Sequence, residues 1–248
     1  MKRLDRVRQV IESDHELIVS SSRLDRLTSG VASVRPLTVA ITLGMAIGAF
    51  AVLGTLQRVY SSESFELWNL DAEGSAPSLF SATLLYGAAA LATLAVIRGG
   101  LERWVLSVAA LWLFLGVDDA NGIHEKLQSA TGVDWQILYA PLAAVGIVLF
   151  IALLKTVTVV PGRLLIVGAL AWTSSQILEL VEHGRVRPVD LYNWYMVPEE
   201  ILEMVGSVCF LIAMLLVLGA PIREPSRQSP PSDMLPLELD GHTGSSAK

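Results

Sequence analysis

Long runs of apolar residues alternate with short polar segments along most of the chain. Crossing about 30 Å of hydrocarbon requires about 20 apolar residues in a helix, and residues 37–56 and 79–97 meet this length. Residues 137–154 come close to it. Residues 201–220 meet it with one carboxylate, Glu203, near the start of the run. The pattern therefore predicts four membrane-spanning helices.

Two further apolar runs are shorter than a membrane requires. Residues 104–117 and 164–177 would each form a helix about 21 Å long at a rise of about 1.5 Å per residue. We expect each span to continue into its polar neighbours, which are Asp118 and Asp119 in the first case and residues 178–183 in the second. The sequence thus predicts an all-α, polytopic membrane protein with a bundle of six transmembrane helices, two of which keep carboxylates inside the membrane boundary.

Positive charge orients the six predicted spans. With the N-terminus inside, 14 of the 18 Lys and Arg residues fall in inner segments, as the positive-inside rule requires. We therefore predict a protein of the plasma (inner) membrane with both termini cytoplasmic. Residues 1–35 place apolar positions near helical spacing among arginines, which favours either an amphipathic helix on the inner leaflet or a solvated basic arm. Residues 221–248 are rich in Pro and Ser and are predicted to be a disordered tail, which leaves residues 36–220 for the bundle.

Composition supports the membrane class and excludes several others. Hydrophobic residues make up 52% of the chain and charged residues 17%, whereas a soluble domain carries about 25% charged residues. A single cysteine, Cys209, excludes a disulfide framework and a Cys-rich zinc module. The formal net charge of −6 argues against nucleic acid as a partner. Membrane lipids are the expected partners, together with a possible homo-oligomer.

The predicted topology brings acidic side chains and two histidines to the outer ends of the third, fifth and sixth spans. His124 and Glu125 join them if the third helix continues past Gly122. At about 100° per residue each helix presents its acids as one stripe, and we expect the stripes to face one another because an ionised carboxylate facing lipid costs about 2.5–3.5 kcal/mol. The set comprises Asp118, Asp119, His124, Glu125, Glu179, Glu182, His183, Glu199, Glu200 and Glu203.

So many carboxylates in one place require protons or a bound cation. Helix-bundle metal sites also combine several acids with two histidines, although they use a Glu-x-x-His spacing that this chain lacks. Oxygen ligands with one or two imidazoles favour Fe, Mn or Zn over Cu(I). We predict Glu125 or Glu182 as the acid or base of a catalytic centre. The predicted ligands of a divalent transition metal are Asp118, Asp119, His124, Glu179, His183, Glu200 and Glu203.

Simpler structural roles compete with this hypothesis. Glu199 and Glu200 follow Pro198, a residue suited to a first helical turn, where acids favour the helix dipole. Asp118 and Asp119 are also explained if they end the third helix at a wet interface. Glu179, His183 and Glu203 are harder to explain in this way because each lies inside its helix on the side of another acid.

The neighbouring side chains also have simpler explanations. Glu125 and Lys126 together are typical of an exposed loop pair, and Ser174 and Ser175 of hydrogen bonding within the bundle. Aromatic residues are typical of the outer interfacial belt. Those near the predicted outer ends are Trp135, Tyr139, Tyr192, Trp194 and Tyr195.

Three segments carry a resemblance to a known group. FLGVDDANGIHEKL, QILELVEHG and PEEILEMVGSVCFLIAML together resemble a recurrent group of bacterial multi-pass membrane proteins that has no established activity. The resemblance spans residues 101–220 and implies a shared fold and site. The chain is not similar to the ceramidase-like membrane hydrolases, which need more histidines. The matching site positions are Asp118, Asp119, His124, Glu125, Glu179, Glu200 and Glu203.

Three functions remain compatible with these residues. The first is a metal-dependent, membrane-embedded enzyme that opens to the outer face and acts on a lipid or another amphiphile. The second is a cation- or proton-coupled transporter in which the acids form the coupling site. The third is a non-catalytic membrane subunit in which the acidic cluster is an interface.

Overall fold

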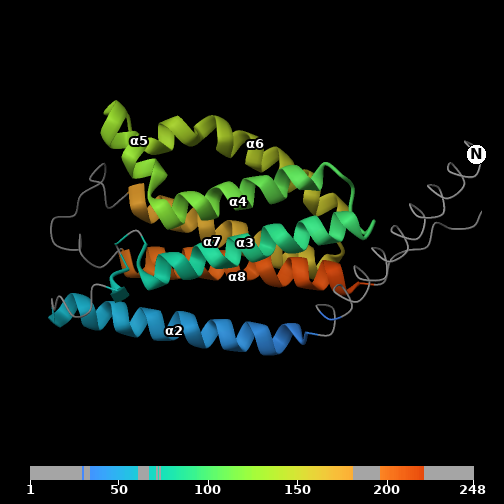
Figure 1. Ribbon diagram of the computed structural model, residues 1–248, viewed down its shortest axis with the longest axis horizontal. Coiled ribbons are helices and arrows are strands. Elements are labelled where there is room, and N and C mark those ends of the chain that lie inside the picture. Colours follow the sequence, from blue (N-terminus) through green and yellow to red (C-terminus); the bar gives the residue numbers. More distant parts are fainter. Residues whose placement is uncertain are drawn as a thin grey trace, which may run out of the picture.

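The regular structure of the described residues is helical, and no strand occurs among them. The computed structural model describes residues 30, 34–60, 67–70, 72, 74–180 and 196–220, and within them seven helices are defined. Figure 1 shows the long helices running along a common direction, with the short α5 at one end. The helices are α2 (Pro36–Tyr60), α3 (Ala76–Ile97), α4 (Val105–Asn121), α5 (Ile123–Thr131), α6 (Trp135–Thr156), α7 (Val159–Leu180) and α8 (Met196–Gly219).

The membrane class and the all-α fold are confirmed, whereas six separate spans are not. Helices α2, α3, α6 and α8 are long and apolar enough to cross a membrane, and α4 with α5 would add a fifth span if the bent pair is counted as one. Helix α7 has 22 residues but is not among these candidates. It carries Arg163 near its start and Glu179 near its end, with a run of polar residues at positions 173–176.

Helix ends near the acidic residues follow ordinary capping rules. Ser75 precedes α3 and its hydroxyl accepts a hydrogen bond from the backbone N–H of Ser78. Asp134 precedes α6 and accepts from the N–H of Gln136 in the same manner. Gly122 and Gly132 end α4 and α5 with φ of 54° and 68°, a conformation that favours glycine. The sequence around α5 therefore specifies a sharp change of direction on both sides of the helix.

The core lies between α3, α4, α7 and α8. Trp112 of α4 stacks on Phe210 of α8 with ring centroids 5.4 Å apart. Helices α7 and α8 form the closest pair, because glycines face each other: a Cβ on Gly168 would lie 3.0 Å from the carbonyl oxygen of Gly206. A Cβ on Gly206 would meet the indole of Trp172. Small residues thus let two backbones approach and let aromatic rings pack beside them.

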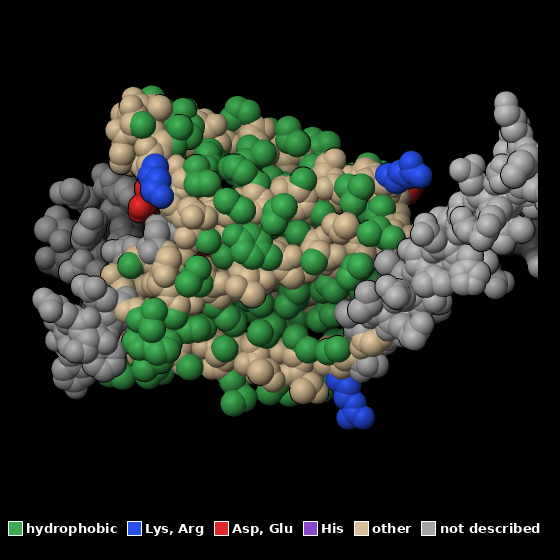
Figure 2. Space-filling model, in the orientation of Figure 1, with side chains coloured by type: hydrophobic (Ala, Val, Ile, Leu, Met, Phe, Trp, Pro, Cys, Tyr) green, Lys and Arg blue, Asp and Glu red, His purple; other side chains and the backbone are tan. Residues whose placement is uncertain are grey.

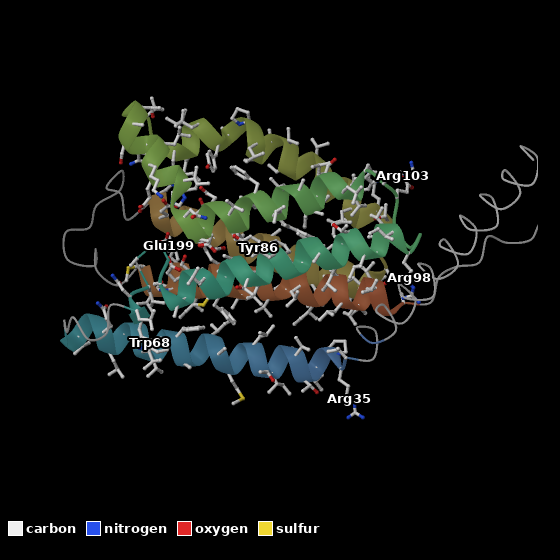
Figure 3. All side chains as sticks on the ribbon, in the orientation of Figure 1. Arg35, Trp68, Tyr86, Arg98, Arg103 and Glu199 are labelled. Carbon is white, nitrogen blue, oxygen red and sulfur yellow. The ribbon has the colours of Figure 1, made fainter. Side chains whose placement is uncertain are left out.

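Charge divides the bundle into two ends. Figure 3 shows Arg35, Arg98 and Arg103 at one end and Glu199 at the other, and Figure 2 shows an apolar belt between the charged ends on the visible face. We call the first the basic end; by the order of the helices it also holds Lys155 and Arg163. The other is the acidic end. Its described acidic residues are Asp118, Asp119, Glu125, Asp134, Glu179, Glu199, Glu200 and Glu203.

Several sequence-based predictions fall outside the described residues. The amphipathic helix predicted for residues 1–35 lies there apart from residues 30, 34 and 35, and so does the predicted tail at residues 221–248. The same is true of residues 181–195, which include Glu182 and His183 as well as three of the predicted belt aromatics.

Candidate functional site

The third predicted span does not continue straight past Gly122. Helix α4 ends at Asn121, Gly122 takes φ 54° and ψ 47°, and α5 leaves at 72° to α4. An L-residue side chain disfavours this backbone conformation, which is why the break falls on the glycine. The condition on which Glu125 was expected to join the acids of the third span, a helix that continues past Gly122, is therefore not met, and Glu125 is exposed on α5.

The same bend folds His124 back onto Asp118. The backbone N–H of His124 donates to Asp118 Oδ1 at 2.9 Å, and the ring Nδ1 lies 3.1 Å from Asp118 Oδ2. Asp118 is buried and His124 half-buried. Because His124 is the second residue of α5, the Asp118 carboxylate also lies at the positive end of that helix dipole. One carboxylate thus caps α5 and orients an imidazole.

Aromatic residues of α6 complete the surroundings of this pair. The Tyr139 hydroxyl donates to Asp118 Oδ1 at 3.1 Å, so this oxygen accepts two hydrogen bonds. The Trp135 ring lies 4.8 Å from the His124 ring between centroids, and it meets Tyr139 edge-on at 5.5 Å. The sequence pattern assigned Trp135 and Tyr139 to an interfacial belt, whereas their polar atoms point to the site carboxylates.

Trp135 links the pair to a second predicted carboxylate. Its indole Nε1–H donates to Glu179 Oε1 of α7 at 2.7 Å. Helix α6 therefore contacts both Asp118 of α4 and Glu179 of α7 through neighbouring side chains one helical turn apart. We expected acids of separate helices to share one region, and Asp118 and Glu179 do so because side chains of α6 contact both of them.

Glu203 of α8 is held by α7 in a neighbouring polar network. Its Oε1 accepts from Ser175 Oγ at 3.2 Å and from Gln176 Nε2 at 3.1 Å. One turn deeper on α8, Ser207 Oγ lies 3.2 Å from Ser81 Oγ and accepts from Trp172 Nε1 at 3.3 Å. The prediction that Ser175 hydrogen-bonds within the bundle is confirmed, and the partner proves to be a predicted site residue.

The remaining predicted acids take more local positions. The backbone carbonyl of Asp119 accepts from Ser78 Oγ at 2.8 Å, which ties the end of α4 to the start of α3. Glu199 is buried and Glu200 half-buried in the first turns of α8. This helix begins at Met196, two residues before the Pro198 start that the sequence suggested. The acids still lie where the helix dipole favours them.

A complete metal site is not formed by the described residues. Within residues 74–180 and 196–220 no three His, Cys, Asp or Glu side chains converge in a way that could hold a metal ion. Asp118 and His124 contact each other, and each of Glu179 and Glu203 is bound by donors from a neighbouring helix. The other predicted site residues, Glu182 and His183, lie outside the described residues.

Sequence reasoning missed three donors of the site. Trp135, Tyr139 and Gln176 each supply a side-chain hydrogen bond to a predicted carboxylate. The signal was present for two of them, because Trp135 and Tyr139 are four residues apart and hence share one helix face directly after an acidic N-cap. Gln176 carried no such signal, since a single amide beside two serines suits any helix interface.

Comparison with known proteins gives one family. Residues 34–218 match the model of a family described as "Domain of unknown function (DUF8692)". The match covers the whole described bundle, including every described residue of the site. Searches of the curated proteins and of the solved structures return no match.

Proposed function

The chain belongs to the DUF8692 family, and we propose that it is a membrane-embedded enzyme acting on a lipid or another amphiphile. The observation that carries the proposal is the Asp118–His124 pair at the acidic end. It combines a buried carboxylate, an imidazole 3.1 Å away and a tyrosine hydroxyl on the same carboxylate. Such a pair is typical of acid–base centres, in which a carboxylate orients a histidine.

The pair supports a specific proton transfer. When Asp118 is ionised, Nδ1 of His124 carries the proton and donates it to Oδ2, so proton transfer to substrate falls to Nε2. Nε2 would take the proton of a water or hydroxyl O–H group as its oxygen bonds to the ester centre of the amphiphile. It would return this proton to the leaving oxygen as the bond between that oxygen and the ester centre breaks. Asp118 would stabilise the imidazolium formed between these steps, while the Trp135 ring restricts how the imidazole turns.

The surroundings of the pair favour an amphiphile as substrate. The acidic end lies beyond an apolar belt of side chains (Figure 2), and exposed aliphatic residues such as Ile137 continue along α6 directly below the site. A molecule with a polar head and an apolar chain would place its head at Asp118 and His124 and its chain along this belt.

We also propose a divalent transition metal, Fe, Mn or Zn, as an alternative to this proton transfer, because a metal and the transferred proton would both use Nε2 of His124. A histidine that binds metal through one nitrogen commonly donates from the other to a carboxylate, as Nδ1 of His124 does to Asp118. Because the described acids and histidine do not converge as three ligands, we assign no reaction step to a metal. Elemental analysis of the purified chain, compared with its His183→Ala variant, tests this part separately.

The enzyme proposal is tested on the full chain in lipid nanodiscs. The probe is a mixture of phosphatidylethanolamine and phosphatidylglycerol, and released products are followed by mass spectrometry. His124→Gln and Asp118→Asn are each expected to lower turnover by about 10²-fold or more, the usual contribution of a positioned acid–base group. Ser129→Ala is the matched control, because Ser129 is exposed on the same helix, is not among the predicted site residues, and should leave turnover unchanged.

Two outcomes would overturn the proposal. The first is wild-type protein that leaves both lipids intact. The second is turnover that falls equally in the His124 and Ser129 variants, because this result would trace the loss to α5 as a whole.

Glu203 favours a second candidate function, a cation- or proton-coupled transporter. It lies about two turns inside α8, one of the helices long and apolar enough to span a membrane, and it accepts hydrogen bonds from Ser175 and Gln176 of α7. Ionisable groups at such depth commonly mark ion or proton routes. Flux into proteoliposomes along a pH gradient that Glu203→Gln abolishes would favour this candidate over the enzyme.

The division of charge supports an orientation for either function. We propose that the chain lies in the plasma (inner) membrane with its basic end and both termini in the cytoplasm. Arg35, Arg98 and Arg103 gather at that end (Figure 3), and Lys155 and Arg163 flank the turn between α6 and α7. The positive-inside rule assigns such an end to the cytoplasm, and the candidate site then faces outward.

A further inference from the structure

Helix α6 is held to the rest of the bundle far less than the other central spans. In its most apolar stretch 6% of the residues are buried, compared with 50% in each of α3 and α8. Its one fully buried residue, Leu153, lies near the basic end. Among the described residues α6 packs against α4 and α5, whereas α7 packs against α8. An outer helix of this kind is free to move where its contacts are weak.

The two halves of α6 are held by different kinds of contact. Toward the basic end, Leu149, Phe150 and Leu153 pack on the apolar core beside α4 and α8. Toward the acidic end, the side chains of Tyr139 and Trp135 donate to Asp118 and Glu179. The side chain of Gln128 on α5, which adjoins α6, also accepts from the backbone N–H of Trp135 at 3.2 Å. The apolar contacts at the basic end do not change when a ligand binds to the site. The side-chain hydrogen bonds of Tyr139 and Trp135 at the acidic end do, because two carboxylates of the site accept them.

Pro141 lies between these two halves. A proline inside a helix lacks the N–H that would bond to the carbonyl four residues earlier, here that of Ile137, and such positions are where helices bend. The chain on the other side of the site is also adapted to bending, since α5 is bounded by Gly122 and Gly132 in left-handed conformations. Residues 135–140 can therefore swing without disturbing the core.

We propose that residues 135–140 of α6 form a lateral gate through which an amphiphile enters the site from the bilayer. The inference rests on the proposed function, because it takes Asp118 and Glu179 as the place where the polar head binds. The two hydrogen bonds from Tyr139 and Trp135 are the latches of this gate. A polar head that bonds to Asp118 Oδ1 or Glu179 Oε1 competes with a latch for the same oxygen atom, so binding and opening are coupled.

The gate is tested by distances between spin labels in nanodiscs. Cys209, the single native cysteine, is first replaced by alanine. One label pair replaces Ile137 of α6 and Ile177 of α7, which are both exposed near the acidic end. A second pair replaces Val148 and Val167, which are exposed closer to the basic end. The latch variant combines Trp135→Phe and Tyr139→Phe, which keep the aromatic rings.

The expected result is a new population of longer distances for the acidic-end pair in the latch variant and an unchanged distribution for the basic-end pair. Tyr86→Phe is the control, because it removes a hydroxyl that bonds to the carbonyl of Gly116 between α3 and α4 and should move neither pair. An unchanged acidic-end pair would overturn the gate, and so would an equal broadening of both pairs. Distances are read without turnover, so failure of the enzyme proposal and failure of the gate are separate results.

Discussion

The hydroxyl of Tyr139 lies 3.1 Å from the carboxylate oxygen of Asp118 that also accepts the backbone N–H of His124. Three elements, α4, α5 and α6, therefore meet at one oxygen atom. Asp118 is consequently a structural residue as well as a candidate acid–base partner, and the two roles require separate measurements. Removing the hydroxyl of Tyr139 weakens the structural contact of Asp118 and leaves the carboxylate and the imidazole in place.

Replacement of Tyr139 by phenylalanine should lower the free energy of unfolding by about 0.5–1.5 kcal/mol, the usual net value of one hydrogen bond. Bonds between membrane helices fall toward the lower part of this range. Denaturant unfolding in detergent micelles measures the change. If Tyr139 and Asp118 act through the same contact, adding Tyr139→Phe to Asp118→Asn should cause no further loss of stability. Additive losses would show that Tyr139 stabilises the fold by another route.

Gly122→Ala should destabilise the bend between α4 and α5. A side chain in the left-handed conformation costs about 1–2 kcal/mol, and Gly122 has φ 54°. Gly122→Asn is the matched control, because asparagine tolerates this conformation better than alanine does. Thermal unfolding of both variants measures the difference. A Gly122→Ala variant as stable as the wild type would mean that α4 and α5 are joined differently.

Gly206→Ala should weaken the contact between α7 and α8. A Cβ there would clash with Trp172 Cδ1 and would lie 2.9 Å from the carbonyl oxygen of Gly168, and overpacking of this kind costs about 1–3 kcal/mol. The control is Gly44→Ala in α2, because no atom lies within 4 Å of its added Cβ. Unfolding in detergent should show a loss for the first variant and no loss for the second. Equal behaviour would contradict the α7–α8 packing.

The proposed orientation predicts which end of the bundle is accessible from outside the cell. In a Cys209→Ala background, Glu125→Cys at the acidic end should react with a membrane-impermeant maleimide on intact cells, since Glu125 is exposed. Glu102→Cys at the basic end, also exposed, should react only after the cells are lysed. Mass shift on a gel measures the labelling. The reverse pattern would place the basic end outside and the candidate site in the cytoplasm.

Apolar runs and cap residues were enough to predict most helices, but not the path of the chain between α4 and α6. The run at residues 37–56 became α2, and that at 79–97 became α3, with bounds a few residues wider. Gly122 was visible in the sequence, yet a glycine inside a helical pattern is compatible with either a straight helix or a break. The structure resolves the choice through Asp118, which caps the new helix.

For the candidate site, the sequence predicted the end of the bundle at which the acids lie but not the side chains that they contact. That Asp118, Glu179 and Glu203 lie at one end of the bundle followed from helix direction alone. Which donor each carboxylate meets depended on the rotation of α6 and α7 about their axes, and hydropathy does not determine rotation when a helix is apolar on all sides. The roles of Trp135 and Gln176 are examples, since both residues suit an interface of any kind.

Helix α7 is synthesised before the helix that fits it best. The backbone contact of Gly168 and the hydrogen bonds of Ser175 and Gln176 all have their partners on α8, and α7 is not among the helices apolar enough to qualify as a span by itself. During biogenesis α7 is therefore expected to wait for α8 while a two-residue turn connects it to α6. A nascent chain that stops short of Met196 would leave these polar groups without their native partners and would be a natural substrate for membrane quality control.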